Sequence, residues 1–183
     1  MPVGDVDDVL DFWFQEAGPA NWFGGGPAFD EEVTRRLRSL YDAAAAGELS
    51  GWAETAPGAL ALCILLDQAP RNIFRGQAQA FATDAAALGI ARTAIAREQD
   101  LMLSDEQRLF VYLPFEHSER IEDQREAVRL IGNRTRNPTL LDYACRHLAV
   151  IAQFGRFPHR NAALGRASTA AELAYLAQPG AGF

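Results

Sequence analysis

The sequence predicts an all-α protein, and three observations lead to that fold class. Apolar residues recur at the three-to-four-residue spacing of helices along most of the 183 residues. No stretch alternates convincingly with the two-residue period of a strand. Capping residues, prolines and glycines bound the periodic segments, as they do at helix ends. We expect a single domain, residues 1–183, built as an antiparallel array of about eight helices.

The N-terminal part predicts two helices separated by a loop. The first runs from Asp5, a capping residue, to Glu16. A Gly- and Pro-rich loop follows over residues 18–27. The second helix ends at Gly47 and has one apolar stripe along its length. That stripe consists of Phe29, Val33, Leu37, Leu40, Tyr41 and Ala44.

The third predicted helix, residues 57–68, belongs at the centre of the fold. It is apolar on every side over residues 59–66, and a helix without a polar face is buried. Pro70 is expected to disturb its last turn. Five more helices are predicted over residues 84–97, 104–113, 121–132, 138–154 and 169–178.

Composition excludes several classes of protein. All 17 basic residues are arginine, and the net charge of −7 argues against non-specific binding to nucleic acids or membranes. Cys63 and Cys145 are too few for a disulfide framework, which fits a reducing cytoplasm. The acidic start resembles no signal peptide, and no apolar run reaches the roughly 18 residues of a membrane span. We expect a cytoplasmic protein.

The first anomaly is Asp67, a carboxylate on the stripe of the most buried helix. Burying it is costly unless it is paired or hydrogen-bonded, and Arg71 is the obvious partner one turn later. One interpretation is an ion pair that braces a helix end. The other is a polar pocket lined by Asp67, Gln68, Arg71 and Asn72.

A second anomaly lies at the junction of two predicted helices. Gln124 occupies a position on an otherwise apolar face. Just upstream, His117 stands close to the carboxylates of Glu116 and Glu119, a combination suited to general acid–base chemistry. The alternative is an ordinary helix cap formed by Ser118 or Glu119.

The remaining histidines lie near similar segments. His147 is on the predicted helix 138–154, where a hydrogen-bonded core histidine is the ordinary interpretation. His159, a further candidate for proton transfer, lies in a turn between Arg156 and Arg160. The histidine spacings match no known metal signature, so we expect no metal and no other cofactor. A cysteine nucleophile is not expected, because Cys145 and His147 face different sides of a helix.

These segments carry a family resemblance. The strings LLDQAPRN, FVYLPFEHSE and FGRFPHRN, with the opening VLDFWF and the closing ASTAAELAYLAQPG, resemble bacterial domain-of-unknown-function family 924 over nearly the whole chain. Ala69 departs from the family, which usually has an aromatic residue there. The resemblance implies a tetratricopeptide-like superhelix and no particular activity. Its motif residues correspond to Asp67, Gln68, Arg71, Asn72, Glu116, His117, Glu119, Arg156, His159, Arg160 and Asn161.

Three hypotheses follow for the polar residues. In the first, a small anionic molecule is bound or converted: arginines hold it, and His117 or His159 moves protons. The candidate arginines are Arg71, Arg75, Arg156 and Arg160, with Gln124, His147 and Asn161 as further ligand contacts. Arg156 and Arg160 have no acid nearby in sequence, which leaves room for a ligand. The alternatives are a groove that binds a protein or peptide, and a purely structural polar core.

The small-molecule hypothesis requires these residues to meet. We therefore expect a single neighbourhood formed by Asp67, Arg71, His117, Gln124, His147, His159 and Arg160.

Overall fold

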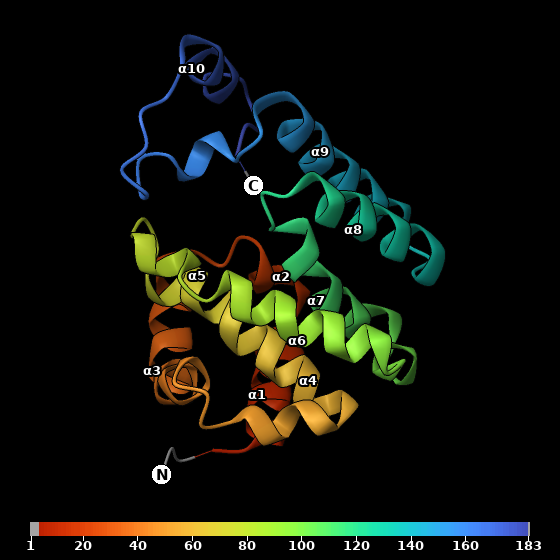
Figure 1. Ribbon diagram of the computed structural model, residues 1–183. Helices are drawn as coiled ribbons and strands as arrows, with labels where there is room; N and C mark the ends of the chain where they lie inside the picture. Colours follow the sequence, from red (N-terminus) through yellow and green to blue (C-terminus); the bar gives the residue numbers. More distant parts are fainter. Residues whose placement is uncertain (1–3, 183) are drawn as a thin grey trace.

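The chain forms a stack of antiparallel helices in a computed structural model that describes residues 4–182 (Figure 1). No strand occurs in that range, which confirms the all-α fold. Elements marked η are short 3-10 or π-helical segments. In chain order the elements are α1 (Val6–Asp11), η1 (Phe12–Ala17), α2 (Pro19–Trp22), α3 (Gly26–Ala45), η2 (Ser50–Glu54), α4 (Ala56–Cys63), η3 (Ile64–Gln68), α5 (Ala69–Ile73), η4 (Ala78–Phe81), α6 (Asp84–Ala96), η5 (Gln99–Met102), α7 (Asp105–Glu116), α8 (Ile121–Arg134), α9 (Pro138–Phe154), η6 (Pro158–Arg160) and α10 (Ala170–Leu176).

The structure adds short helical elements that the sequence analysis did not predict. The predicted loop at residues 18–27 contains α2, and the predicted turn around His159 contains η6. Both elements have proline in their first turn, where its missing N–H costs nothing. The tetratricopeptide-like superhelix and the single domain stay predictions, and the ends of the predicted domain lie outside the described residues.

The helix through the Asp67 segment continues past Pro70 and does not stop there. Over Ile64–Gln68 the winding loosens to a π-helix, and the N–H of Ala69 donates to the carbonyl of Ile64. Pro70 has no N–H for the carbonyl of Leu66, four residues earlier. The hydroxyl of Thr83 donates to that carbonyl instead, at 2.6 Å. Pro70 is therefore accommodated inside a continuous helical segment.

The main hydrophobic core surrounds α4, which contacts α1, α6 and α7. Every residue of α4 except Pro57 is buried, as its unbroken apolar sequence predicts. The later helices extend the stack in chain order: α7 packs on α8, and α8 on α9. No helix in the described range is both long and apolar enough to span a membrane.

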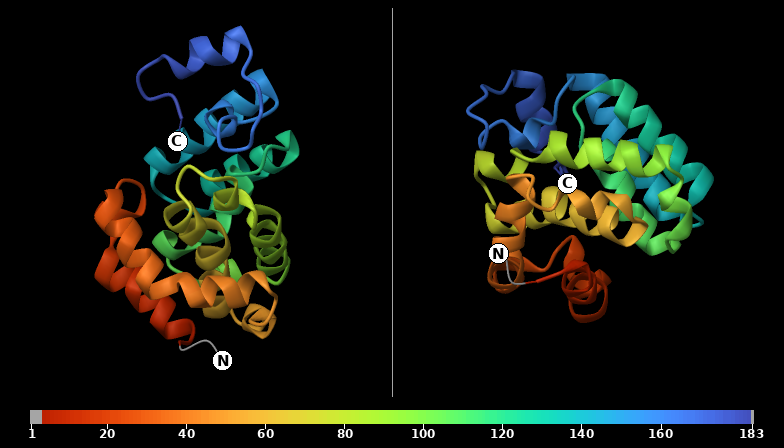
Figure 2. Two further views of the ribbon diagram at one scale, coloured as in Figure 1. Left: turned by 90° about the vertical axis from the view of Figure 1, so that its left-hand side faces the viewer. Right: turned by 60° about the horizontal axis from the view of Figure 1, so that its bottom comes forward.

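The C-terminal part has a small core of its own. Val150, Ile151 and Phe157 form it, with the partly buried Phe154 and Tyr175 packed against them. Helix α10 lies at the end of the molecule opposite the N-terminal helices, and the chain then returns toward the middle (Figures 1 and 2). A polar boundary separates this part from α5 and α6.

Candidate functional site

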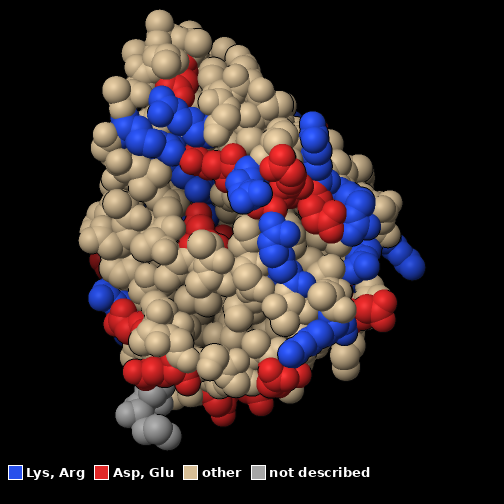
Figure 3. Space-filling model, viewed as in Figure 1, with Lys and Arg blue, Asp and Glu red and all other residues tan. Residues whose placement is uncertain are grey.

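Five residues from five elements meet at this boundary, which we call the polar seam. It consists of Asp67 (η3), Arg71 (α5), Asp84 (α6), Arg160 (η6) and His117, which caps the end of α7. In Figure 3 basic and acidic side chains form a band across the upper half of the molecule, and the surface is hollowed at its left. Segments up to 93 residues apart (67 to 160) thus share one neighbourhood.

Asp67 and His117 form the centre of the seam. Both carboxylate oxygens of Asp67 lie close to Nδ1 of His117, at 2.8 and 2.9 Å. The amide of Gln68 donates to Oδ2 of Asp67 at 2.5 Å. Asp67 is fully buried, whereas the His117 side chain is 14% exposed. One imidazole edge is therefore held by a carboxylate in the interior while the ring reaches the surface.

Two arginines share the carboxylate of Asp84. Arg71 donates to its two oxygens at 2.9 and 3.1 Å, and Arg160 donates to Oδ2 at 3.1 Å. Arg71 also lies 3.3 Å from Oδ1 of Asp67. The guanidinium of Arg160 is stacked between the rings of Phe81 and Phe157, 4.6 Å from each centroid, and donates to the carbonyl of His117 at 3.0 Å.

Burial and neighbouring charges shift the pKa values of Asp67 and His117. Burial raises the pKa of Asp67, but Arg71 and His117 outweigh it, so the pKa lies well below its usual value. Burial, reinforced by Arg71, lowers the pKa of His117 despite the opposing charge of Asp67. At neutral pH Asp67 is therefore ionised and His117 uncharged. Nδ1 of His117 then carries the proton that Asp67 accepts, and Nε2 is left with a lone pair.

A second carboxylate–imidazole pair lies beside the first. Nδ1 of His147 is 2.9 Å from Oε1 of Glu116 and donates to the carbonyl of Tyr143 at 2.9 Å. The side chains of His147 and Glu116 are 6% and 4% exposed. The rings of His147 and His117 have centroids 6.1 Å apart. Gln124 fixes the turn between the helices by donating to the carbonyls of Glu116 and Ser118, at 2.5 and 2.7 Å.

His159 borders the seam on its C-terminal side. Its ring lies 5.5 Å from that of Phe157. Burial, followed by the charge of Arg160, lowers the pKa of His159 to about 4. Burial and the nearby Arg71 also lower the pKa of Arg160, to about 10. The seven residues expected to converge thus lie in or directly beside the seam.

Other candidates take up separate contacts. Asn72 donates to Asp30 at 2.8 Å, together with the bidentate Arg75. Glu119 accepts from Arg166 and from the backbone N–H of Phe157. These contacts join parts of the fold that are distant in sequence.

The expectation that Arg156 and Arg160 lack carboxylate partners is wrong. Arg156 forms a bidentate ion pair with Glu172 at 2.6 and 2.8 Å, and Arg160 reaches Asp84. These acids lie 16 and 76 positions away in sequence, beyond the reach of local reasoning. Asn161 also has protein partners, Ser168 and Arg166.

Sequence reasoning missed three members of the neighbourhood: Asp84, Phe81 and Phe157. An acidic residue in the first turn of a helix is ordinary, so Asp84 gave no signal. The described residues also contain no cluster of three or more His, Cys, Asp or Glu side chains arranged to hold a metal.

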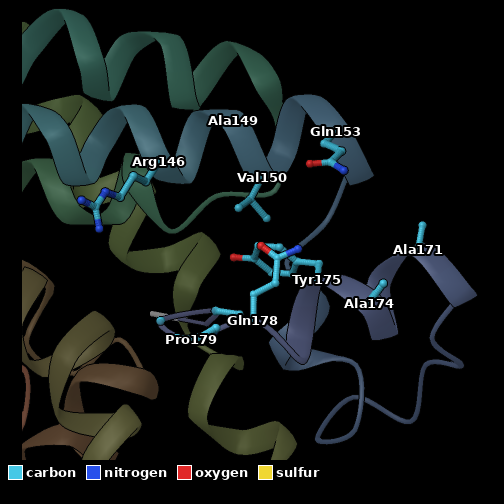
Figure 4. A pocket seen from close by; sticks show the side chains of 11 residues that line it. Arg146, Ala149, Val150, Gln153, Ala171, Ala174, Tyr175, Gln178 and Pro179 are labelled. Carbon is cyan, nitrogen blue, oxygen red and sulfur yellow. The ribbon is translucent and has the colours of Figure 1, made fainter.

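Two open clefts lie away from the seam. One, of about 580 Å³, runs between α9 and α10 and is lined by residues such as Arg146, Gln153, Tyr175 and Gln178 (Figure 4). The other, of about 630 Å³, is lined by Phe154, Arg156 and Glu172 among others. Neither cleft contains a histidine. We place the candidate site in the seam, because the seam contains a partly exposed imidazole, His117, whose pKa is lowered by burial and by Arg71.

Comparison with known proteins gives a family and a structural relative. Residues 9–180 match the family model described as bacterial protein of unknown function (DUF924). A solved structure of a protein of unknown function from Agrobacterium tumefaciens is similar at 44% identity, with a TM-score of 0.89, covering 94% of this chain and 96% of that one. No curated protein matches.

Proposed function

We propose that this chain, which belongs to the DUF924 family of bacterial proteins of unknown function, uses the polar seam as its functional site. The seam binds a small anionic molecule, and His117 removes a proton from it as a general base. Asp67 orients His117, while Arg71 and Arg160 attract the negative charge of the substrate.

The Asp67–His117 pair is the observation that carries this proposal. A carboxylate that holds one imidazole nitrogen fixes the ring and leaves the other nitrogen to accept a proton. Burial and Arg71 keep His117 uncharged near neutral pH, the state that a base requires. The π-helical turn at Asp67 fits this role, because such turns are frequent at functional sites.

The anion binds by replacing the carboxylate of Asp84 on Arg71 and Arg160. Without ligand, the two arginines are balanced by Asp67 and Asp84. The Asp84 side chain is 20% exposed at the start of α6, so it can turn toward water when a ligand carboxylate or phosphate replaces it. The protein carboxylate thus competes with the ligand for the same donors.

A thermal-shift screen of phosphates, nucleotides and dicarboxylates tests the binding step. An anion at about 100 times its dissociation constant should stabilise the fold by roughly 2.7 kcal/mol. For a chain of this size that corresponds to a rise in melting temperature of about 5–10 °C. If no anion in the screen raises the melting temperature, the proposal fails.

Two seam variants should change the affinity for that anion in opposite directions. Asp84→Asn removes the competing carboxylate and should tighten binding by about tenfold, whereas Arg160→Gln should weaken it by at least as much. Arg75→Gln is the matched control, because Arg75 also forms a bidentate aspartate pair but lies outside the seam. Weaker binding by Asp84→Asn, or equal responses of Arg160→Gln and the parent protein, would contradict exchange at Asp84.

A further inference from the structure

The start of α6 has backbone donors that its own capping residue does not use. The first N–H groups of any helix have no acceptor inside that helix, and a Ser or Thr just before it commonly accepts from them. Thr83 stands at this position of α6 but forms no cap, because its hydroxyl donates to the carbonyl of Leu66. The N–H groups of the first turn therefore stay available at the positive end of a 13-residue helix.

Two arginines meet at this helix start. Arg71 and Arg160 both donate to the carboxylate of Asp84, the first residue of α6. Both guanidiniums also lie against the ring of Phe81, at 5.7 and 4.6 Å from its centroid. The start of α6 thus lies beside α5 and faces the C-terminal part of the chain (Figure 1). Arginine side chains and a helix N-terminus, two features that bind phosphate groups in proteins, therefore occur together here.

One buried donor of this cluster has no acceptor. The Arg160 side chain is 7% exposed, and its two terminal nitrogens donate to Asp84 and to the carbonyl of His117. Within the described part of the chain, its Nε has no hydrogen-bond partner although it is buried. Burial, followed by the nearby charge of Arg71, lowers the pKa of Arg160 to about 10. The guanidinium therefore lacks one acceptor and part of its charge compensation.

We infer that the anion bound in the seam is the phosphate group of a phosphate monoester, held by the two arginines and by the N–H groups of Ala85 and Ala86. This inference rests on the proposed function, in which an anion replaces the carboxylate of Asp84. A carboxylate there has two oxygens, and Arg71 already takes both. A phosphate monoester has three terminal oxygens in a tetrahedral arrangement, so it can accept from Arg71, from Arg160 and from the helix start at once.

The surroundings of the helix start leave room for such a group. Ala85 and Ala86 are exposed, and their methyl groups are too small to cover the N–H groups of the first turn. The side chains of Arg71 and Asp84 are 21% and 20% exposed, so the position of the Asp84 carboxylate is open to water. The phosphate serves as a binding group and is not transferred, while the rest of the molecule extends toward the imidazole of His117.

Binding of methyl phosphate and of malonate to the whole chain tests the inference. Both are mainly dianions at about pH 8, so charge alone does not distinguish them. Calorimetry should show methyl phosphate binding at least about tenfold more tightly than malonate. In nitrogen-15 NMR spectra of the backbone, the amide signals of Ala85 and Ala86 should shift in proportion to the bound methyl phosphate.

A proline substitution removes one of the proposed N–H donors. Ala85→Pro alters the second position of α6, where α3 and α4 have Pro27 and Pro57, so the helix should form. It should weaken methyl phosphate binding by about tenfold or more, because a hydrogen bond to a charged group is lost. Ala171→Pro is the matched control: Ala171 is the second residue of α10 and lines both clefts away from the seam. Its affinity for methyl phosphate should equal that of the parent protein.

The outcomes separate this inference from the proposed function. Malonate that binds as tightly as methyl phosphate and responds to Arg160→Gln but not to Ala85→Pro overturns the phosphate assignment alone. Methyl phosphate that does not bind, that leaves the amide signals of Ala85 and Ala86 in place, or that is weakened by Ala171→Pro overturns it as well. Dianion binding that is unaffected by Arg160→Gln overturns the proposed function. If Ala85→Pro fails to fold, the amide signals of the parent protein still decide whether phosphate binds at the start of α6.

Discussion

Asp67 is a buried carboxylate whose contacts also position the imidazole of His117. It is fully buried, and its oxygens are occupied by Gln68, Arg71 and His117. Such an arrangement is held in place because removing Gln68 or His117 leaves a buried oxygen without its hydrogen bond, and removing Arg71 takes away the compensating charge. The same requirement orients the imidazole of His117. Stability and positioning therefore depend on the same contacts.

Asp67→Asn should lower the free energy of unfolding by about 3–5 kcal/mol, because Arg71 loses a buried partner. Urea denaturation measures the change. Asp42→Asn is the matched control: Asp42 also pairs with an arginine but is 54% exposed, so its loss should cost roughly 0–1 kcal/mol. Equal losses of unfolding free energy in the two variants would show that the buried pair stabilises the fold no more than the exposed pair does.

The pH dependence of stability provides a test at His159. Its pKa is lowered to about 4 by burial and Arg160, so the folded protein holds it neutral where the unfolded chain protonates it. The unfolded state then binds more protons, and stability present above about pH 6.5 is lost as the pH falls toward 4. Between pH 7 and pH 5 the melting temperature should fall more for the parent than for His159→Gln. Parallel curves would refute this contribution.

At the scale of elements, the sequence predicts the long helices but not how the helix through Asp67 continues past Pro70. The apolar stripe of α3 predicts a helix with one buried face, and the unbroken apolar run of α4 predicts a helix that is buried all round. The helix can continue past Pro70 because the hydroxyl of Thr83 donates to the carbonyl of Leu66, which is 17 positions away in sequence. A contact of that kind has no local signature.

The C-terminal segment, residues 155–182, should open more readily than the body. Its small core rests on Phe157, and ionic contacts such as Arg160–Asp84 and Arg166–Glu119 join it to the body. Hydrogen exchange should therefore be faster here than in α4. Arg160→Gln should accelerate exchange in this segment by about tenfold or more, since a hydrogen bond to a charged group is worth roughly 1.5–3 kcal/mol. Uniform acceleration across the chain would contradict a local opening.

On the scale of the whole molecule, the sequence indicated four of the five seam residues and the pairing of Asp67 with Arg71. Asp67 stood out as a carboxylate on an apolar stripe, His117 as a histidine close to two carboxylates, and Arg160 as an arginine with no acid nearby in sequence. Asp84 did not, because an acid at a helix start is common. The pairing of Arg160 with Asp84 follows from how α6 and η6 meet across the boundary, a property of packing between distant segments.

The position of a bound anion tests the central claim most directly. A crystal structure of the protein with whichever anion raises the melting temperature should show it in the polar seam. We predict an acidic oxygen on Arg71 and Arg160, the Asp84 side chain turned away, and a proton-bearing atom of the ligand within hydrogen-bond distance of Nε2 of His117. An anion bound instead in the cleft between α9 and α10, with Asp84 still on both arginines, would contradict the account.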